Sequence, residues 1–444
     1  MTLWPVIGVL VLFFMGVPCA FAMMMVCIPY FLADPYMSAT VIAQKMLASC
    51  ESQSLMAIPF FITAGAIMNY SGISEKLMAF ADGLVGHLTG GLGHVNVLIS
   101  TLMGGISGSG AADCAMECKV LFPEMLKYGY SKQYSAAITA ATACITPIIP
   151  PGINLILFAC MCECSVGRLL AAGYIPGILL SVAFLILNYY ISKKRGYVGA
   201  RKKMMPIGQL FKLFLEAAWA LFLPFGLIMA LRFGVCTPTE GGVLMGFYSL
   251  LVGKFVYRKL ELKKLPQILT EAVNSTAPVM LILCAANLFS YYMSWETIPT
   301  QLTQLLLSLT DNKWVFLLLC NILFLLVGCF MDAMAVMIVI APLLAPVVRA
   351  LGIDITHFGL MMCFNVGLAA ITPPFGTYIF MVSGLLKMKT SEMIKEIWPF
   401  IGVAIAVLLL ITYVPGFSTF IPNLMYGLDE KEFENERFNF YCSL

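Results

Sequence analysis

The stretch GGISGSGAADCAMECKVLFPEMLKYGYSKQYSAAITAATACITPIIPPGINL, residues 104–155, decides the fold. Its first end, Gly104–Asp113, is dense in Gly and Ser, and its second end, Thr139–Asn154, runs through small residues into Pro147, Pro150 and Pro151. Each end interrupts a helix, because Gly lowers helix stability and Pro removes a backbone N–H donor. In a lipid-embedded chain, broken helix is tolerated only where it is buried in protein or lines a cavity. We therefore expect freed carbonyl oxygens here, which are suitable ligands for a hard cation.

The same pattern occurs a second time, 223 residues further along the chain. The matching positions are Gly105 and Gly328, Pro123 and Pro346, Gly129 and Gly352, Pro150–Pro151 and Pro373–Pro374, and Pro176 and Pro399. Interrupted segments at corresponding places in two halves are the sequence signature of a secondary transporter.

Composition places the chain in a membrane. Of its 444 residues 61% are hydrophobic and 11% are charged, whereas a soluble domain carries roughly 25% charged residues. The net charge of +3 is small and the basic residues gather in two short loops, so we expect no nucleic-acid surface. The 15 cysteines lie mostly in apolar segments, where buried Cys behaves as a small hydrophobe. Cys160, Cys162 and Cys164 lack His partners, which favours packing over a metal site.

The apolar runs and loops predict an order of segments along the chain. Residues 3–33 form either one tilted span or two shorter pieces, because about 20 apolar residues are needed to cross a bilayer. We expect an N-terminal scaffold segment (1–50, with a polar connector at 34–51), a first repeat (51–192), a basic loop (193–206), a scaffold helix pair with a second basic loop (207–264), a second repeat (265–414) and a polar tail (415–444).

Two basic loops predict the orientation. Residues 193–206 carry six cations and no acid, and residues 254–264 carry five cations and one Glu. Because two expected spans separate these loops, both lie on one side, which the positive-inside rule makes cytoplasmic. If the repeats are inverted, the chain near Glu51 and the acidic tail lie outside.

The Gly/Ser segment offers a cation site. Ser107, Ser109 and the carbonyls around Gly105 would face residues 142–151, and by the repeat residues 328–332 would face residues 369–376. Unwound backbone beside Ser and Thr supplies several oxygens at short range. The alternative is a small-residue helix-packing surface, which a Gly/Ser run alone would favour. The second copy and the two Pro pairs favour the cation site.

Charged residues inside apolar segments are the next candidates. Asp113 and Asp332 are costly in lipid and functional by default, although a helix-cap or packing role is the alternative. They are not repeat partners, as expected if an asymmetric substrate binds between two related ion sites. Glu117 and Lys119 are expected at the membrane surface or neutralising each other. Glu240 is expected to cap a helix in the box Thr237-x-x-Glu240.

Five motifs in order resemble a known family. GGISGSGAAD, TPIIPPGINL, AAGYIPGIL, GVCTPTEGG and the block from FMDAMAVMIVIAP to ITPPFG together resemble the large membrane subunit of tripartite ATP-independent periplasmic (TRAP) transporters over nearly the whole chain. The resemblance implies an all-α polytopic membrane protein of the ion-transporter type, with two inverted repeats, re-entrant helical hairpins and broken helices. It also implies sodium-coupled uptake of an organic acid by an elevator motion in the bacterial inner membrane, with a small four-helix membrane subunit and a periplasmic substrate-binding protein as partners.

The resemblance also implies site residues. Ser107, Ser109, Gly105 and the carbonyls of Ile145 and Pro147 would form one sodium site, and Gly328, Asp332, Ala370 and Thr372 a second. The candidates for substrate binding are Asp332, Asp113, Asn154 and Thr377.

Three functions remain in competition at this stage. The first is the TRAP permease subunit, carrying a C4-dicarboxylate, sialic acid or similar carboxylate, with Na⁺ as coupling ion and no other cofactor. The second is a stand-alone ion-coupled anion carrier. The third is an intramembrane aspartyl protease, which would need Asp113 and Asp332 to share one proton, but neither follows a Gly. The chain has no G-x-x-x-x-G-K-[ST] loop, so ATP is not the expected energy source.

Overall fold

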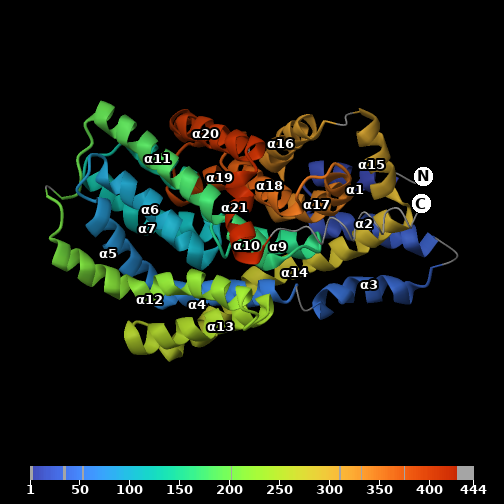
Figure 1. Cartoon of the computed structure of the whole chain (residues 1–444), viewed down its shortest axis with the longest axis horizontal. Helices are drawn as coiled ribbons and strands as arrows, with labels where there is room; N and C mark the ends of the chain where they lie inside the picture. The colour runs from blue at the N-terminus through green and yellow to red at the C-terminus, as the bar shows by residue number, and fades with distance from the viewer. Residues whose placement is uncertain are drawn as a thin grey trace.

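The computed structural model describes residues 4–33, 37–52, 55–201, 203–309, 312–331, 333–374 and 376–427, without the side chains of residues 14, 305 and 307–309. The regular structure of these residues is helical (Figure 1). Among them, six helical stretches are long and apolar enough to cross a membrane: Val166–Arg195, Ile207–Arg232, Leu262–Trp295, Lys313–Phe330, Ala333–Ala350 and Thr390–Tyr413. The predicted all-α polytopic membrane fold is confirmed.

Two sets of helices follow the sequence repeat. The first set is α4 (Ala57–Tyr70), α5 (Ile73–Val85), α6 (Gly91–Ser107), α7 (Gly110–Lys127), α8 (Lys132–Thr142), α9 (Ile153–Met161), α10 (Val166–Ala172) and α11 (Tyr174–Arg195). The second set is α14 (Leu265–Trp295), α15 (Ile298–Leu309), α16 (Lys313–Phe330), α17 (Ala333–Ala350), α18 (Ile355–Ala369), α19 (Thr377–Leu385) and α20 (Thr390–Tyr413).

The helix boundaries preserve the offset of 223 residues. Adding 223 to the bounds of α7, 110 and 127, gives 333 and 350, which are the bounds of α17. Adding 223 to the last residue of α6, 107, gives 330, the last residue of α16. The Pro150–Pro151 and Pro373–Pro374 peptide bonds are both cis. The duplication read from the sequence is therefore present in the hairpin arms and the breaks of the structure.

The first set contains a helical hairpin that turns inside the molecule. In the first hairpin, α6 ends at Gly108, whose φ of +59° lies in the left-handed region that favours glycine. Ser109 follows in an extended conformation and caps α7 by accepting a hydrogen bond from the Ala112 N–H. The chain therefore reverses between Ser107 and Gly110, at the Gly/Ser segment that the sequence singled out.

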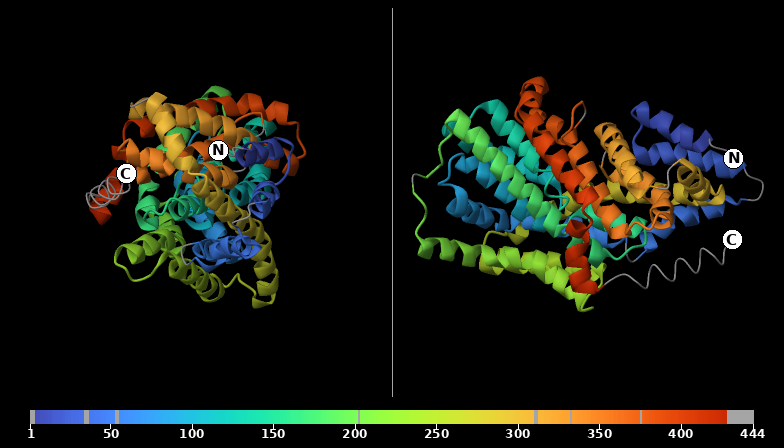
Figure 2. Two further views of the ribbon diagram at one scale, coloured as in Figure 1. Left: turned by 90° about the vertical axis from the view of Figure 1, so that its right-hand side faces the viewer. Right: turned by 45° about the horizontal axis from the view of Figure 1, so that its top comes forward.

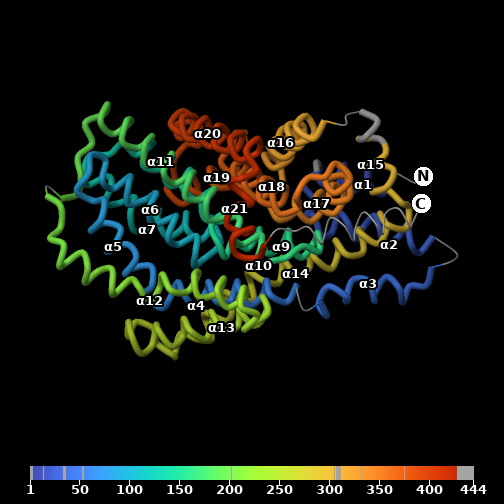
Figure 3. The backbone as a smooth tube through the Cα atoms, in the orientation of Figure 1, coloured from blue at the N-terminus to red at the C-terminus, as the bar shows by residue number. Residues whose placement is uncertain are grey.

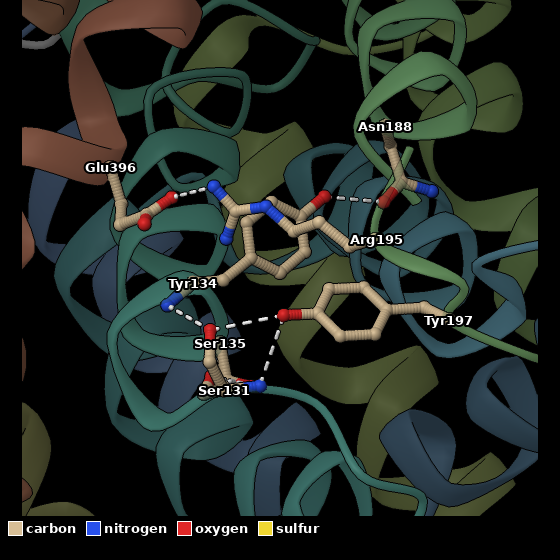
Figure 4. A network of polar contacts seen from close by, with 7 residues as sticks. All are labelled: Ser131, Tyr134, Ser135, Asn188, Arg195, Tyr197 and Glu396. Carbon is tan, nitrogen blue, oxygen red and sulfur yellow. Dashed lines mark hydrogen bonds and ion pairs between the residues drawn. The ribbon is translucent and has the colours of Figure 1, made fainter. Parts of the chain in front are cut away.

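The helix pair α11 and α20 serves as a common reference for the orientation of the two repeats. Arg195, the last residue of α11, forms a 2.6 Å ion pair with Glu396 in the second turn of α20. The end of one helix thus lies beside the start of the other, and the two run antiparallel (Figure 2). Tyr134 of α8 joins the same cluster, because its hydroxyl donates to Asn188 of α11 (2.6 Å) and its ring lies 5.3 Å from the Arg195 guanidinium (Figure 4).

The two hairpins approach the α11–α20 pair from opposite ends. In the first, the Tyr130 hydroxyl beyond the end of α7 donates to the Val198 carbonyl beyond the end of α11 (3.2 Å). In the second, the ring of Trp314, at the start of α16, lies 5.8 Å from the ring of Tyr413, at the end of α20. The backbone tube shows α6 and α7 reaching inward from the end opposite to α15 and α16 (Figure 3). The repeats are therefore inverted relative to each other.

The remaining helices lie mainly along one side and at the right-hand end of the molecule in Figure 1. They are α1 (Trp4–Phe14), α2 (Cys19–Ala33), α3 (Ala39–Glu51), α12 (Ile207–Arg232), α13 (Pro238–Leu251), its π-helical continuation η1 (Val252–Val256), the short 3-10 helix η2 (Leu262–Lys264) and α21 (Gly416–Tyr426). Thr237 and Glu240 form the predicted capping box at the start of α13, with the Thr237 N–H donating to Glu240 Oε2 (2.7 Å).

Of the two alternatives for the N-terminal apolar run, the structure shows two shorter pieces, α1 and α2. Two other segments differ from the sequence-based expectations. The expected polar connector at 34–51 is largely helix α3, whose Ser49 hydroxyl donates to the Leu283 carbonyl of α14 (3.1 Å), because tertiary packing supplies a partner that the sequence does not reveal. The expected polar tail begins as helix α21, which packs against α10. The acidic part of the tail lies outside the described residues.

Candidate cation and substrate sites

The tip of the first hairpin rests against the break between α8 and α9. A Cβ atom added to Gly104 would lie 3.1 Å from Thr146 Cα, and one added to Gly108 would lie 2.6 Å from the Pro151 carbonyl oxygen. Gly105 approaches the Pro150 carbonyl oxygen in the same way, at 3.3 Å. The absence of side chains at these glycines therefore lets the backbone of the tip approach the carbonyl groups of the break.

Asp113 lies at the centre of this contact. Its side chain is 2% exposed, Oδ1 accepts a hydrogen bond from the Ser107 hydroxyl (2.9 Å), and Oδ2 accepts one from the Thr146 hydroxyl. No basic side chain of the described residues pairs with this carboxylate. A buried carboxylate with neutral neighbours is expensive unless a cation or a proton compensates it. The site is therefore suited to a cation.

The break itself supplies backbone oxygens. The carbonyl of Ile145 accepts hydrogen bonds from the N–H groups of Ile148 (3.0 Å) and Ile149 (3.2 Å). Within the described residues, no hydrogen bond reaches the carbonyl oxygens of Pro147, Pro150 and Pro151. Among the predicted ligands in the break, Pro147 thus offers a freer oxygen than Ile145.

Glu117 contradicts its sequence-based prediction. It is not at the membrane surface and is not paired with Lys119, which is exposed; its own side chain is fully buried. Glu117 Oε1 accepts a hydrogen bond from the Ser100 hydroxyl (2.7 Å), and Oε2 lies 3.5 Å from the Thr142 hydroxyl. The prediction was wrong because it considered neighbours in sequence, whereas α6 and α8 provide the partners.

The two buried acids belong to one polar layer between α6, α7 and α8. Asn96 continues this layer, since its amide donates to the Thr139 hydroxyl (2.9 Å) and its Oδ1 accepts from the Thr142 hydroxyl (2.6 Å). The sequence reasoning missed this layer, although a signal was present. Its members recur at helical spacing in three apolar segments: Asn96, Ser100 and Ser107; Asp113 and Glu117; Thr139, Thr142 and Thr146.

The second hairpin meets the second break in a related way. A Cβ atom on Gly328 would lie 2.5 Å from the Ala369 Cβ, and the Cys329 thiol lies 3.9 Å from the Pro373 carbonyl oxygen. The Ala370 carbonyl accepts a hydrogen bond from the Tyr378 N–H (3.0 Å), and the Thr372 hydroxyl donates to the Leu368 carbonyl (2.9 Å). Asp332 lies outside the described residues. The structure thus brings together Gly328 and the segment that holds Ala370 and Thr372.

Asn154 and Thr377 occupy corresponding positions after the two breaks, since 154 plus 223 is 377. Asn154 is the second residue of α9, and Thr377 is the first residue of α19. Neither side chain forms a hydrogen bond within the described residues. Helix N-termini present unpaired N–H groups and a partial positive charge, which favour anions.

The first hairpin tip contacts the start of α9 and one side chain of α19. A Cβ atom on Gly108 would lie 3.2 Å from the Ile153 N at the start of α9. A Cβ atom on Gly110 would contact the Tyr378 hydroxyl, one residue into α19. The structure therefore places the tip of the first hairpin against the start of α9, which holds Asn154, and against the Tyr378 side chain of α19.

Helices outside the hairpin bundle also contact the tip of the first hairpin. A Cβ atom on Gly65 of α4 would lie 3.4 Å from the Ser107 carbonyl oxygen, and Pro224 of α12 lies 3.1 Å from the position of a Gly105 Cβ. The tip therefore lies at the boundary between the hairpin bundle and the α4–α12 side of the molecule.

Comparison with known proteins gives consistent results. Residues 6–417 match the family described as the tripartite ATP-independent periplasmic transporter, DctM component. The sialic acid TRAP transporter large permease protein SiaM of Vibrio cholerae is 34% identical over 422 residues, covering 95% of this chain and 98% of that protein. The isethionate TRAP transporter permease protein DctMQ of Oleidesulfovibrio alaskensis is 35% identical over 409 residues, covering 91% of this chain and 64% of that protein.

A solved structure shares the fold. The YdaH transporter of Alcanivorax borkumensis superposes with a TM-score of 0.64 at 15% sequence identity, covering 85% of this chain and 88% of that one. At this level of identity the likeness concerns the fold alone.

Proposed function

The chain belongs to the DctM component of the tripartite ATP-independent periplasmic transporters, and from this premise we propose that it is the permease subunit of a sodium-coupled importer of an organic acid in the bacterial inner membrane. Its relatives are named as transporter permeases, which favours transport over the aspartyl protease hypothesis. The observation that carries the coupling proposal is the buried Asp113 carboxylate, held by Ser107 and Thr146 where the hairpin tip meets the broken helix.

We assign the first cation site to this contact. Asp113 supplies the negative charge, Ser107 and Ser109 supply hydroxyl groups, and Pro147 supplies a backbone oxygen. Na⁺ is a hard cation that prefers such oxygen ligands. Because both oxygens of Asp113 accept hydrogen bonds inside the hairpin and the break, this residue suits the cation better than it suits the substrate.

The second cation site would form where Gly328 meets Ala370 and Thr372, with Asp332 as its acid. Two sites related by the inverted repeat give the importer two places at which an ion gradient can act. Asp332 remains a candidate for substrate contact as well.

The substrate would bind between the starts of α9 and α19. The N–H groups of the two helices would meet the acidic group, and the side chains of Asn154 and Thr377 would donate hydrogen bonds to it. The relatives named above act on sialic acid and isethionate, one a carboxylate and the other a sulfonate. Both groups suit a site built from N–H and O–H donors, and a C4-dicarboxylate is the third candidate.

Cation binding would change the substrate site directly, because the hairpin tip touches the start of α9 and the Tyr378 side chain of α19. An elevator motion would carry the hairpin bundle past α4 and α12, where the present contacts are Gly65 to Ser107 and Gly105 to Pro224. Small residues on both sides of this boundary allow close sliding contact. A small four-helix membrane subunit and a periplasmic substrate-binding protein would complete the transporter.

Uptake into proteoliposomes tests the proposal. The chain is reconstituted with its small subunit, labelled sialic acid, succinate or isethionate is offered with each candidate binding protein, and external Na⁺ is replaced by choline in the control. We expect uptake of one acid that needs both Na⁺ and one binding protein. Uptake with Na⁺ and no binding protein would favour the stand-alone carrier, and uptake indifferent to Na⁺ would refute sodium coupling.

A further inference from the structure

A cleft of about 420 Å³ lies between α5, α12 and η1. Lys76 of α5 forms one wall, Lys212, Leu215 and Trp219 of α12 form another, and Val256 and Tyr257 close it from the end of η1. Three segments that are distant in sequence therefore build this cleft.

The cleft carries one uncompensated positive charge. Lys76 is paired with Glu216 at 2.8 Å, so the only acid in the wall is already neutralised. Lys212 is exposed and forms no ion pair or hydrogen bond within the part of the chain that the structure describes. Glu216 also attracts Lys212 electrostatically, so the two lysines share one acid and the cleft keeps a net charge of +1 that favours an anion beside Lys212.

The other part of the cleft is apolar and aromatic. Leu215 is 51% exposed, Trp219 is 49% exposed and Val256 is 42% exposed. Tyr257 is held in place, because its hydroxyl donates to the Glu216 carbonyl of α12 (2.7 Å). A cation next to exposed apolar side chains, with Trp and Tyr between them, is typical of a surface at the boundary of headgroups and acyl chains.

The position of the cleft residues along the chain also indicates the boundary between headgroups and acyl chains. Helix α12 begins at Ile207, directly after the basic loop 193–206, and η1 ends at Val256 inside the basic segment 254–264. The positive-inside rule places both on the cytoplasmic side, where the leaflet contains anionic lipids. Lys212 is therefore about one turn inside the cytoplasmic boundary.

From these observations we propose that the cleft binds an anionic phospholipid of the cytoplasmic leaflet. The phosphate contacts Lys212 and approaches Lys76, and one acyl chain runs along Leu215 and Trp219. Since α5 leads into the first hairpin and α12 is on the other side of the boundary that the tip touches, the lipid links the two parts of the molecule.

Fluorescence quenching of Trp219 tests the proposal on the full-length chain. Phosphatidylglycerol or phosphatidylcholine with brominated acyl chains is added in mixed micelles, and the quenching of Trp219 is obtained as the difference between wild type and Trp219→Phe. We expect phosphatidylglycerol to quench Trp219 at a lower mole fraction than phosphatidylcholine. Lys212→Gln should reduce this preference about fivefold, the factor that corresponds to ~1 kcal/mol for one basic residue near an anionic membrane surface.

Two control variants keep the test specific. Lys212→Arg should retain the preference, and Lys194→Gln, which removes an exposed cation from the last turn of α11, should leave it unchanged. Equal quenching by the two lipids, or a preference that survives Lys212→Gln, would overturn the proposal. Displacement of the brominated lipid by soluble glycerol phosphate would show a site for small anions and would overturn the lipid assignment.

Discussion

Ser107→Ala tests the first cation site most directly. The substitution removes the hydroxyl that donates to Asp113 Oδ1 at 2.9 Å, and it leaves the Thr146 bond to Oδ2 in place. Ser107 is 7% exposed, so water has little access to replace the lost group. The Ser109 N–H also loses an acceptor, because it donates to the Ser107 hydroxyl oxygen (3.3 Å), whereas Gly108 and the Ser109 cap of α7 remain.

The size of the effect follows from the interaction that is lost. A hydrogen bond to a charged group contributes about 1.5–3 kcal/mol, and each 1.4 kcal/mol changes an affinity about tenfold. If the hydroxyl orients Asp113 and ligates the cation, Ser107→Ala should raise the Na⁺ concentration for half-maximal effect by about 10- to 100-fold.

Thermal unfolding in detergent measures this effect without knowledge of the substrate. Na⁺ at about 100 times its Kd stabilises the folded state by ~2.7 kcal/mol, and a tenfold weaker site reduces this to ~1.4 kcal/mol at the same concentration. The informative quantity is the difference in Tm between NaCl and choline chloride, because Ser107→Ala lowers stability in both salts.

Ser181→Ala is the matched control. Ser181 is also a buried serine, in α11; it donates to the Gly177 carbonyl (2.7 Å) and accepts from the Thr101 hydroxyl of α6 (2.7 Å), and it forms no hydrogen bond to Asp113. It should lower Tm without shifting the Na⁺ titration. An unchanged Na⁺ midpoint in Ser107→Ala, or an equal shift in Ser181→Ala, would refute the assignment of the site.

Three further changes examine the polar layer, the substrate site and the topology. Glu117→Gln should lower the free energy of unfolding by about 1–3 kcal/mol, because the amide has one acceptor oxygen where the buried carboxylate beside Ser100 has two; an unchanged Tm would contradict this role. Asn154→Ala should raise the KM for the acid and leave the Na⁺ midpoint unchanged, and an unchanged KM in the uptake assay would remove Asn154 from the substrate site. Lys203→Cys is made in a variant whose other accessible cysteines have been removed. A membrane-impermeant maleimide should label this cysteine only after the cells are permeabilised, and labelling of intact cells would refute the proposed orientation.

The positions of the helix breaks could be predicted because they depend on local chemistry. Gly108 and the Pro150–Pro151 pair interrupt helices whatever surrounds them, and the offset of 223 transfers the same boundaries to the second half. The capping box at Thr237 is local in the same sense, because its two hydrogen bonds join residues only three positions apart.

The polar layer was harder to predict, since its contacts join residues from three helices. The hydrogen bond from Ser100 to Glu117 spans 17 positions, and the one from Thr146 to Asp113 spans 33. Glu117 next to Lys119 suggested a surface pair in the sequence, but the two side chains point to different environments on α7. Helical spacing indicates which residues share a face, and it does not indicate which other helix covers that face.

The sequence by itself determined that this protein is a helical membrane protein, that its two halves repeat, and where each half breaks its helices. These properties follow from apolar composition and from the backbone limits of Gly and Pro, which act within a few residues. Only the tertiary structure decided that the hairpins enter from opposite ends, that Glu117 is buried, and that the first hairpin tip contacts the start of α9 and the Tyr378 side chain of α19. These properties depend on packing between segments that in some cases are more than 220 positions apart. The burial of apolar faces and the need to satisfy buried polar groups select one arrangement of these segments.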